Sequence, residues 1–417
     1  MTSDLPSAPR IAIACGGTGG HLFPGFAVAG KLLEKGSAVM LLVSPKQVDQ
    51  QSLDQVTGAE VITLPGVGLV RGQSFAFLRG FYLSFHAAKR SFSERRPGAV
   101  LAMGGFTSAP PILAAKRCGA HTFLHESNTI PGRANRWLAR IVDLAFVGFP
   151  SAAQRLRCRN TVVTGTPVRA SIHLREPAAC RAALGLDPLR PVVLVMGGSQ
   201  GARAINELVV QCLPSLAGTN PDWQWLHLSG PSDCDTIKAA YASLHMAASV
   251  RPFLSDMDLA LGAATAAISR AGASSLAELA TMRLPAVLLP YPNATHNHQF
   301  FNAQAFEETG AACLLQQQTS TPEQLSGQLR RIMTDASERQ KMQQALARWD
   351  APAAADQIAT AILEAIGRDV QSANAGARTH VRGSSMSDEL NHCSSQRARR
   401  GSQPSRFFTK PGGVAWS

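Results

Sequence analysis

Two glycine-rich turns in this chain carry the residue types that bind phosphate. The first, residues 15–21 (CGGTGGH), follows the apolar run 11–14, and the second, residues 197–203 (GGSQGAR), follows the apolar run 192–196. Each pattern predicts a buried strand, a tight turn and a helix start, which together present free backbone N–H groups and the positive end of a helix. Two such turns predict two phosphate-binding halves with a reaction in a cleft between them.

Four more polar segments follow predicted strands: 103–108 (MGGFTS), 125–128 (HESN), 269–278 (SRAGASSLAE) and 293–299 (NATHNHQ). Their hydroxyl, amide and charged groups suit contacts with a sugar and a diphosphate. The alternative is that they only hold their own turns in place. Two histidines in the last segment stand two residues apart without a third ligand nearby, so no metal site is expected.

A general base is predicted at the first turn. His21 directly follows the glycines, and an imidazole there can take a proton from a hydroxyl group. Glu126 and His125 are the competing candidates for this role. A cap or an anion contact is the alternative role of His21.

Short apolar runs alternate with helical patterns along most of the chain. This alternation predicts parallel sheets covered by helices on both faces, in two doubly wound halves whose ligands bind beyond the carboxyl ends of the strands. The first series of strands is expected at 11–14, 38–43, 99–103, 121–124 and 161–164, and the second at 192–196, 223–228, 266–269 and 286–289. We therefore predict domains at 1–165 and 166–367, the last helix packing back on the first domain, and a basic tail at 368–417.

Composition limits the class of protein. The chain has 417 residues, 45% of them hydrophobic and 16% charged, which is typical of a folded globular protein. No apolar stretch reaches the roughly 20 residues of a membrane span, and the first residues do not resemble a secretory signal. The eight cysteines form no CxxC pair, so neither zinc nor a disulfide framework is expected.

The net charge of +12 calls for an anionic partner or surface. No aromatic and basic readout motif for nucleic acid is present, so nucleic acid is not expected as a partner. A membrane surface is a better candidate, because residues 70–85 concentrate aromatic side chains among arginines. The predicted membrane patch is Phe75, Phe77, Phe81 and Phe85, and the alternative is an ordinary amphipathic helix packed on the core.

Taken together, these strings resemble the MurG family of bacterial glycosyltransferases. GGTGGHLFPG, GGF, HESN, GTPVR, GGSQGAR, SRAGASSLAEL and HNHQFFNA occur in the order of the family, over roughly residues 10–365. The pattern departs at His296, where members often carry an acidic residue, and the basic tail has no counterpart.

The resemblance implies a GT-B fold and an inverting transfer of N-acetylglucosamine from UDP-GlcNAc to undecaprenyl-diphospho-N-acetylmuramoyl pentapeptide (lipid I), which gives lipid II for peptidoglycan. The first domain would face the acceptor and membrane, and the second would bind UDP-GlcNAc. No cofactor is implied. The expected location is peripheral, on the cytoplasmic face of the plasma membrane, and other proteins of cell-wall synthesis and division are possible partners.

The resemblance also implies a set of binding residues. The acceptor diphosphate is expected at Gly16, Gly17, Gly104 and Gly105. The donor is expected to contact Thr18, Gly19, Gly20, Asn128, Arg169, Ser199, Leu254, Arg270, Ala273, Ser274, Ser275, Leu276, Ala277, Glu278, His298 and Gln299.

Other functions stay open at the level of the sequence. Another UDP-sugar GT-B enzyme, such as a UDP-GlcNAc 2-epimerase, would share the donor turns without a membrane patch. A non-catalytic, membrane-attached module that binds a UDP-sugar would bind the donor without transfer. A Rossmann oxidoreductase fits less well, because the first turn lacks the GxGxxG pattern.

Overall fold

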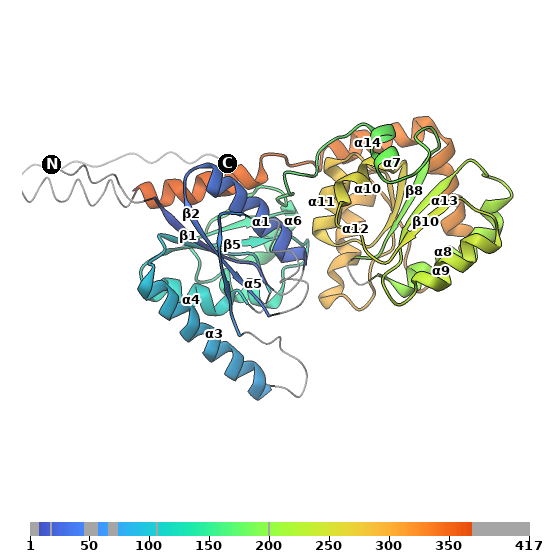
Figure 1. Ribbon diagram of the computed structural model, residues 1–417. Helices are drawn as coiled ribbons and strands as arrows, with labels where there is room; N and C mark the ends of the chain where they lie inside the picture. Colours follow the sequence, from blue (N-terminus) through green and yellow to red (C-terminus); the bar gives the residue numbers. More distant parts are fainter. Residues whose placement is uncertain are drawn as a thin grey trace, which may run out of the picture. The chain divides into compact units, whose positions relative to one another are not determined.

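The computed structural model describes residues 8–16, 19–45, 57–65, 74–105, 107–198 and 201–368. Two parallel sheets form its framework (Figure 1). We call each sheet with the helices packed on it a lobe. The predicted tail from 369 onward lies outside the described residues, as do Gly17, Thr18 and Ser199 of the predicted sites.

The sheet of the first lobe has seven strands in the order β3-β2-β1-β4-β5-β6-β7, and every neighbouring pair is parallel. Its central strands are buried on both faces, as expected of apolar runs in a parallel sheet. The strands are β1 (Arg10–Ala14), β2 (Ala38–Val43), β3 (Glu60–Thr63), β4 (Ala99–Ala102), β5 (His121–Glu126), β6 (Leu144–Val147) and β7 (Thr161–Val163).

The sheet of the second lobe has six parallel strands in the order β10-β9-β8-β11-β12-β13. In both lobes the strand order reverses beside the first strand, between β1 and β4 and between β8 and β11. Ligands of doubly wound sheets bind at this reversal point, and both glycine-rich turns follow the strands that flank it. The strands are β8 (Val192–Met196), β9 (Gln224–Leu228), β10 (Ala248–Arg251), β11 (Ala266–Ser269), β12 (Ala286–Leu288) and β13 (Cys313–Leu314).

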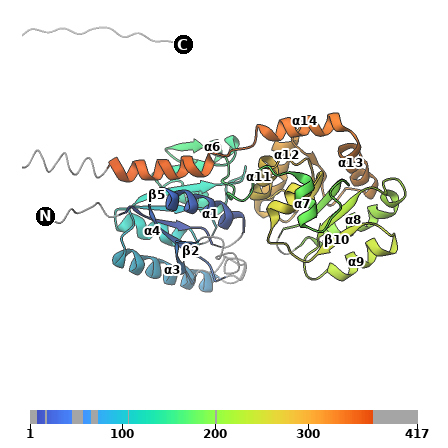
Figure 2. The same ribbon diagram turned by 45° about the horizontal axis from the view of Figure 1, so that its top comes forward.

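Helices cover both faces of the first sheet. α1 and the last helix, residues 354–368, lie on one face, where Ile358 and Ile362 share a buried cluster with Ile11 and Phe26 (Figure 2). α3 and α4 pack against each other and contribute to the cluster on the other face. The helices of this lobe are α1 (Gly19–Glu34), α3 (Ser74–Glu94), α4 (Ala109–Arg117), α5 (Arg133–Leu138) and α6 (Pro150–Leu156).

The second lobe has a corresponding set of helices. α8 and α13 pack together over β8 and β11, with Leu213 and Leu329 fully buried. A capping box of Thr321 and Gln324 fixes the start of α13. The helices are α7 (Pro177–Ala183), α8 (Arg203–Ala217), α9 (Cys234–Ser243), α10 (Met257–Ala263), α11 (Ala273–Thr281), η2 (Thr295–Asn297), α12 (His298–Glu308), α13 (Pro322–Thr334) and α14 (Ala336–Ala347).

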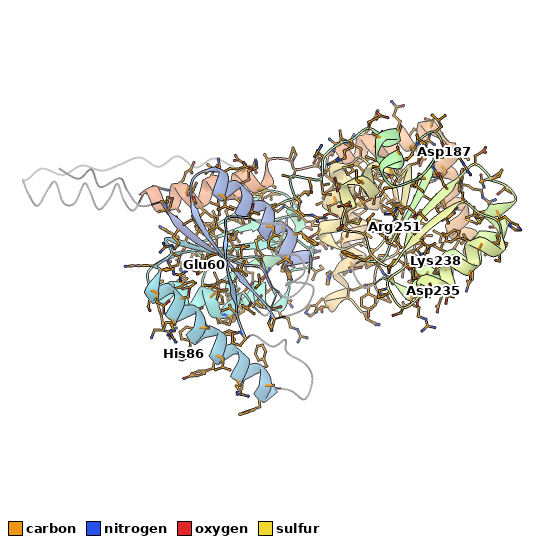
Figure 3. The ribbon with its side chains drawn as sticks, in the orientation of Figure 1. Glu60, His86, Asp187, Asp235, Lys238 and Arg251 are labelled. Carbon is orange, nitrogen blue, oxygen red and sulfur yellow. The ribbon has the colours of Figure 1, made fainter. Side chains whose placement is uncertain are left out.

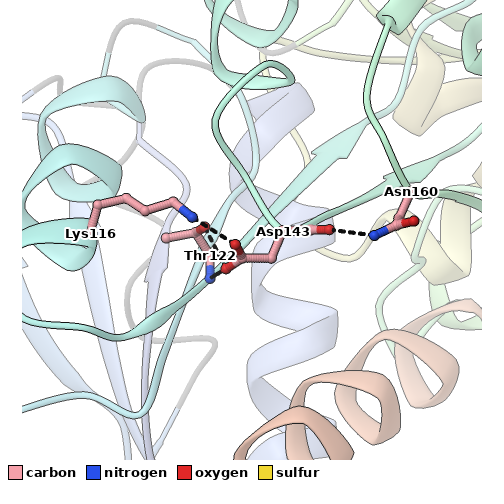
Figure 4. A network of polar contacts seen from close by, with 4 residues as sticks. All are labelled: Lys116, Thr122, Asp143 and Asn160. Carbon is pink, nitrogen blue, oxygen red and sulfur yellow. Dashed lines mark hydrogen bonds and ion pairs between the residues drawn. The ribbon is translucent and has the colours of Figure 1, made fainter.

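An anchored carboxylate joins β5 to the segment before β6. Asp143 accepts hydrogen bonds from Lys116 Nζ at 2.6 Å and from the backbone N–H and hydroxyl of Thr122 at 2.7 and 2.8 Å (Figure 4). Burial by itself raises the pKa of Asp143, but the bonds from Lys116 and Thr122 outweigh it and lower this pKa. The Asp143 carbonyl accepts a further bond from Asn160, so the segments that precede β6 and the edge strand β7 are tied to each other.

The predicted strands are all present, and four more were missed: β3, β6, β10 and β13. β3 and β10 are edge strands with exposed positions, so they lack the continuous apolar run of a central strand. β13 has only two residues, whereas β6 is a mostly buried apolar run of four residues that the sequence analysis did not single out. The segment that connects the two sheets, between the end of β7 at Val163 and the start of β8 at Val192, contains the predicted domain boundary. The boundary itself stays a prediction.

Candidate functional site

The glycine turns of the first lobe are built around close approaches of the backbone. A Cβ atom at Gly16 would lie 2.3 Å from the backbone nitrogen of Ser44, so only glycine fits beside the end of β2. Thr107 donates its hydroxyl to the Gly16 carbonyl at 2.7 Å. This bond ties the turn after β1 to the segment after β4, at the reversal point of the sheet.

His21 lies against the second glycine pair. A Cβ atom at Gly104 would come within 2.9 Å of His21 Cε1, and one at Gly105 within 3.3 Å of His21 Cδ2. Both glycines have positive φ, +108° and +79°, which other residues rarely adopt. The two glycines therefore let the imidazole rest on the backbone, and four sequence-predicted residues, Gly16, His21, Gly104 and Gly105, come together.

His125 and Glu126, the competing candidates for the base, have structural roles instead. His125 is fully buried, its Nε2 lies 3.1 Å from the Gly165 carbonyl, and burial lowers its pKa to about 4. Glu126 is 1% exposed and accepts bonds from the backbone N–H groups of Asn128 and Gly132. Its carboxylate also accepts from the side chains of Asn128 and Asn135. We therefore correct the sequence interpretation: these two side chains hold the loop after β5 and have no open face toward a substrate.

Asn302 links the two lobes, and sequence analysis did not single it out. Its side chain is fully buried on α12. The Oδ1 atom accepts from the backbone N–H and hydroxyl of Thr129 at 2.9 and 3.0 Å. The Nδ2 atom donates to Asn128 Oδ1 at 3.0 Å and to the Ala271 carbonyl at 3.2 Å. All four hydrogen-bonding positions of the amide are thus filled, and Asn302 joins the loop after β5 to the start of α11.

Arg270 is held in place by the backbone of the second lobe. Its guanidinium donates to the carbonyls of Leu289 and Pro290 and lies 5.5 Å from the Tyr291 ring. Burial lowers its pKa to about 10, so it stays charged at neutral pH. The positive charge therefore lies beside the turn after β11, held by its bonds to two backbone carbonyl groups.

The start of α11 faces the first turn of α1. Its N-cap is Gly272, which offers no side-chain cap to the free N–H groups of the helix. Ser274 donates its hydroxyl to the Gly20 carbonyl at 3.2 Å. Ala273 and Leu276 are buried, so those two can offer a ligand only backbone groups, whereas Ser275 and Ala277 are partly exposed.

Arg169 and Glu278 form a buried ion pair near α1. Arg169 Nη2 lies 3.0 Å from Glu278 Oε1, and the two side chains are only 13% and 12% exposed. The Arg169 guanidinium also lies 4.2 Å above the ring of Phe23. Burial raises the pKa of Glu278, and the nearby Arg169 acts in the opposite direction. Two predicted donor residues from distant parts of the sequence are thus brought together.

The segment before α12 has an unusual backbone. His296 and Asn297 both have positive φ, +54° and +55°. His296 Nε2 lies 3.0 Å from Arg136 Nη2 and 3.4 Å from Arg133 Nε, and burial together with these cations lowers its pKa.

The two predicted donor contacts of this segment have local partners. His298 Nδ1 lies 2.8 Å from the Thr295 carbonyl, and Gln299 accepts from the backbone N–H of Tyr291 at 2.9 Å. Leu254 is 8% exposed and belongs to the core cluster. Its predicted contact with uracil therefore stays a prediction.

The aromatic helix α3 presents two faces. Phe81 and Phe85 are half-buried and pack on the core, whereas Phe75 is 82% exposed. Leu78 and Tyr82 are 62% and 61% exposed, and with Phe75 they follow the three- and four-residue spacing of one helix face. His86 extends from the exposed side of the helix (Figure 3), and its ring is tilted by 49° against that of Tyr82 with 4.2 Å between the centroids. We call Phe75, Leu78 and Tyr82 the apolar stripe. Of the four residues of the predicted membrane patch, only Phe75 belongs to this stripe.

Within the described residues no helix is long and apolar enough to span a membrane, and no cluster of three His, Cys, Asp or Glu residues could hold a metal ion.

Comparison with known families matches both lobes. The model of the glycosyltransferase family 28 N-terminal domain matches residues 11–147, and that of the glycosyltransferase family 28 C-terminal domain matches residues 192–358.

Curated relatives cover most of the chain. A protein of Methylococcus capsulatus is 36% identical over 86% of this chain and 99% of its own length. A protein of Lacticaseibacillus casei is 35% identical over 84% of this chain and 96% of its own length. Both are named UDP-N-acetylglucosamine--N-acetylmuramyl-(pentapeptide) pyrophosphoryl-undecaprenol N-acetylglucosamine transferase.

Solved structures agree. The crystal structure of Acinetobacter baumannii MurG has a TM-score of 0.67 at 28% identity and covers 85% of this chain and 99% of its own. A putative UDP-N-acetylglucosamine 2-epimerase from Listeria monocytogenes has a TM-score of 0.64 at 14% identity, covering 88% of this chain and 97% of its own, and so supports the fold alone. The predicted GT-B fold, two Rossmann-like doubly wound halves, is confirmed.

Proposed function

This chain belongs to glycosyltransferase family 28, within its MurG group, and we infer that it transfers N-acetylglucosamine from UDP-GlcNAc to undecaprenyl-diphospho-N-acetylmuramoyl pentapeptide. The product is lipid II, a precursor of peptidoglycan. The observation that carries the inference is the match of both lobes, over nearly the whole length of relatives named for this reaction.

The second lobe is proposed to bind the donor. The free N–H groups at the start of α11, with Arg270 nearby, supply positive potential for the diphosphate that leaves. Glu278 is proposed to accept hydrogen bonds from the ribose, since its carboxylate lies on the same helix. Arg169 already lies 3.0 Å from Glu278 and is proposed to contact the donor beside it.

The first lobe is proposed to bind the acceptor and to supply the base. Gly104 and Gly105 lie against His21, and the Thr107 hydroxyl ties Gly16 to the same segment, so these turns are proposed to receive a second diphosphate. His21 takes the proton from the acceptor hydroxyl as UDP departs, in a single displacement that inverts the sugar carbon. The hydrogen bond from Ser274 to Gly20 supports this arrangement, because it joins the donor helix to the helix that carries His21.

A peripheral position at the cytoplasmic face of the plasma membrane is proposed for the chain. The acceptor carries a long lipid, so the enzyme has to work at a membrane surface. The apolar stripe of Phe75, Leu78 and Tyr82 is exposed on α3, with Arg79, Lys89 and Arg90 on the same helix. An apolar surface among cations suits an anionic leaflet.

The experiment is a transfer assay with labelled UDP-GlcNAc and a soluble analogue of the lipid acceptor. The expected product is the disaccharide-linked lipid, with release of UDP. Conversion of UDP-GlcNAc to its 2-epimer without acceptor would favour the epimerase, and donor binding without any product would favour a non-catalytic module.

A further inference from the structure

A pocket of about 700 Å³ lies between α5 and α6. Five arginines line it, Arg133, Arg136, Arg140, Arg155 and Arg157, and we call it the arginine pocket. Its described lining contains no aspartate or glutamate.

The charges of the arginine pocket are not neutralised within the described part of the chain. The ion pairs found there involve none of the five arginines. Three of them bond to neutral partners, Arg133 and Arg136 to His296 and Arg155 to the Thr129 carbonyl. Cations gathered around one hollow repel one another and create a positive potential, which an anionic ligand relieves.

The apolar part of the lining restricts the kind of anion. Trp137 is 44% exposed at the pocket, and Ile130 and Pro131 line it as well. Guanidinium groups bind carboxylates through paired hydrogen bonds, and an indole ring covers small apolar groups. A peptide end with a free carboxylate and short side chains has both features.

The pocket also lies next to the proposed donor site. Arg136 contacts His296 at 3.0 Å, two residues before His298. Arg155 donates to the Thr129 carbonyl at 2.9 Å, and Asn302 fixes Thr129 from the other side. A group bound in the pocket is therefore held beside the loop that carries Asn128.

From this placement we propose that the arginine pocket binds the carboxylate end of the pentapeptide of the acceptor. The proposal rests on the proposed function, in which the pentapeptide is attached to the sugar that is glycosylated. An anionic phospholipid headgroup is the other source of negative charge. The contact of Arg136 with His296 favours the peptide, because a headgroup has no need to reach the donor loop.

The test compares two soluble acceptors with a short prenyl chain. One carries the pentapeptide with its free terminal carboxylate, and in the other that carboxylate is a carboxamide. We expect the KM of the native chain to be roughly tenfold lower for the carboxylate acceptor. In Arg140→Gln/Arg157→Gln the ratio of the two KM values should fall toward one, whereas the matched control Arg96→Gln, an exposed arginine outside the pocket, should keep the native ratio.

Two results would overturn the proposal. The first is a native chain whose KM values for the two acceptors are nearly equal, and the second is a double variant whose KM ratio is the same as that of the native chain. Loss of binding to vesicles with anionic phospholipid in the double variant, together with a ratio near one in the native chain, would assign the pocket to headgroups. Failure of the native chain to glycosylate either acceptor would contradict the proposed function instead. Calorimetric binding of the free pentapeptide and of its carboxamide would then still decide the role of the pocket, since equal affinities for the two peptides would exclude a site for the terminal carboxylate.

Discussion

Asn302 allows the connection between the lobes to be tested quantitatively. Replacement by alanine removes four hydrogen bonds and leaves Thr129, Asn128 and the Ala271 carbonyl without their partner in a buried place. At about 1 kcal/mol net for each bond, with incomplete additivity, the loss should be about 3 kcal/mol. For a chain of 417 residues that corresponds to a fall of roughly 4 °C in Tm.

The assay is thermal unfolding of Asn302→Ala beside Asn302→Asp and the control Asn160→Ala. The aspartate keeps the acceptor for Thr129, but its second oxygen faces Asn128 Oδ1 and the Ala271 carbonyl, to which it cannot donate. Asn302→Asp should therefore not restore the stability that Asn302→Ala loses. Asn160 donates one bond of 3.2 Å at an exposed site, and its loss should cost less than about 1 kcal/mol. A fall in Tm of less than about 1 °C for Asn302→Ala, or stability restored by aspartate, would refute the reasoning.

Three further predictions follow from single contacts. Gly104→Ala should lower kcat strongly and destabilise the fold by about 2 kcal/mol, because the new Cβ would contact His21 and because φ at this position is +108°. The control Gly30→Ala, whose Cβ would have nothing within 4 Å, should be neutral or stabilising. Equal effects of the two variants in unfolding and turnover assays would contradict this. The pKa of Asp143 is lowered, so its contribution to stability is complete above the ordinary carboxyl value of 3.8 and is lost as the pH falls through the lower pKa of the folded state. Below pH 4, the Tm of Asp143→Asn should therefore fall less steeply with decreasing pH than the Tm of the native chain. An equal slope in both proteins would contradict this contribution. Phe75→Ser/Tyr82→Ser should weaken co-sedimentation with anionic vesicles about tenfold. The control Val163→Ser, which also replaces an exposed apolar side chain, should bind vesicles like the native chain. Unchanged binding of the double variant would exclude the apolar stripe as the membrane contact.

Sequence patterns predicted the elements that are buried on both faces. The runs 38–43 and 192–196 are strands with those bounds, because a central parallel strand has to be apolar along its whole length. β3 escaped prediction because it lies at the edge, where its exposure alternates.

The sequence predicted the residue types of the candidate site, but it did not predict which of their side chains are buried. His125 and Glu126 have the chemistry of a base, yet they end β5 between two neighbouring strands, and both side chains are buried. A signal for Asn302 does exist in the sequence: it lies four residues before Phe306, on the helix face that is apolar and buried. A polar residue on such a face needs partners, but only the structure identifies Thr129, Asn128 and Ala271.

The central claim is that the first glycine turn presents His21 to the acceptor while the second lobe holds the donor. The most direct measurement is the kcat of His21→Ala with UDP-GlcNAc and a soluble lipid acceptor, together with KM for both substrates. We predict that kcat falls by about 100-fold or more while the donor KM changes little, because a lost general base affects the chemical step. A kcat near that of the native chain would contradict the assignment of His21 as the base.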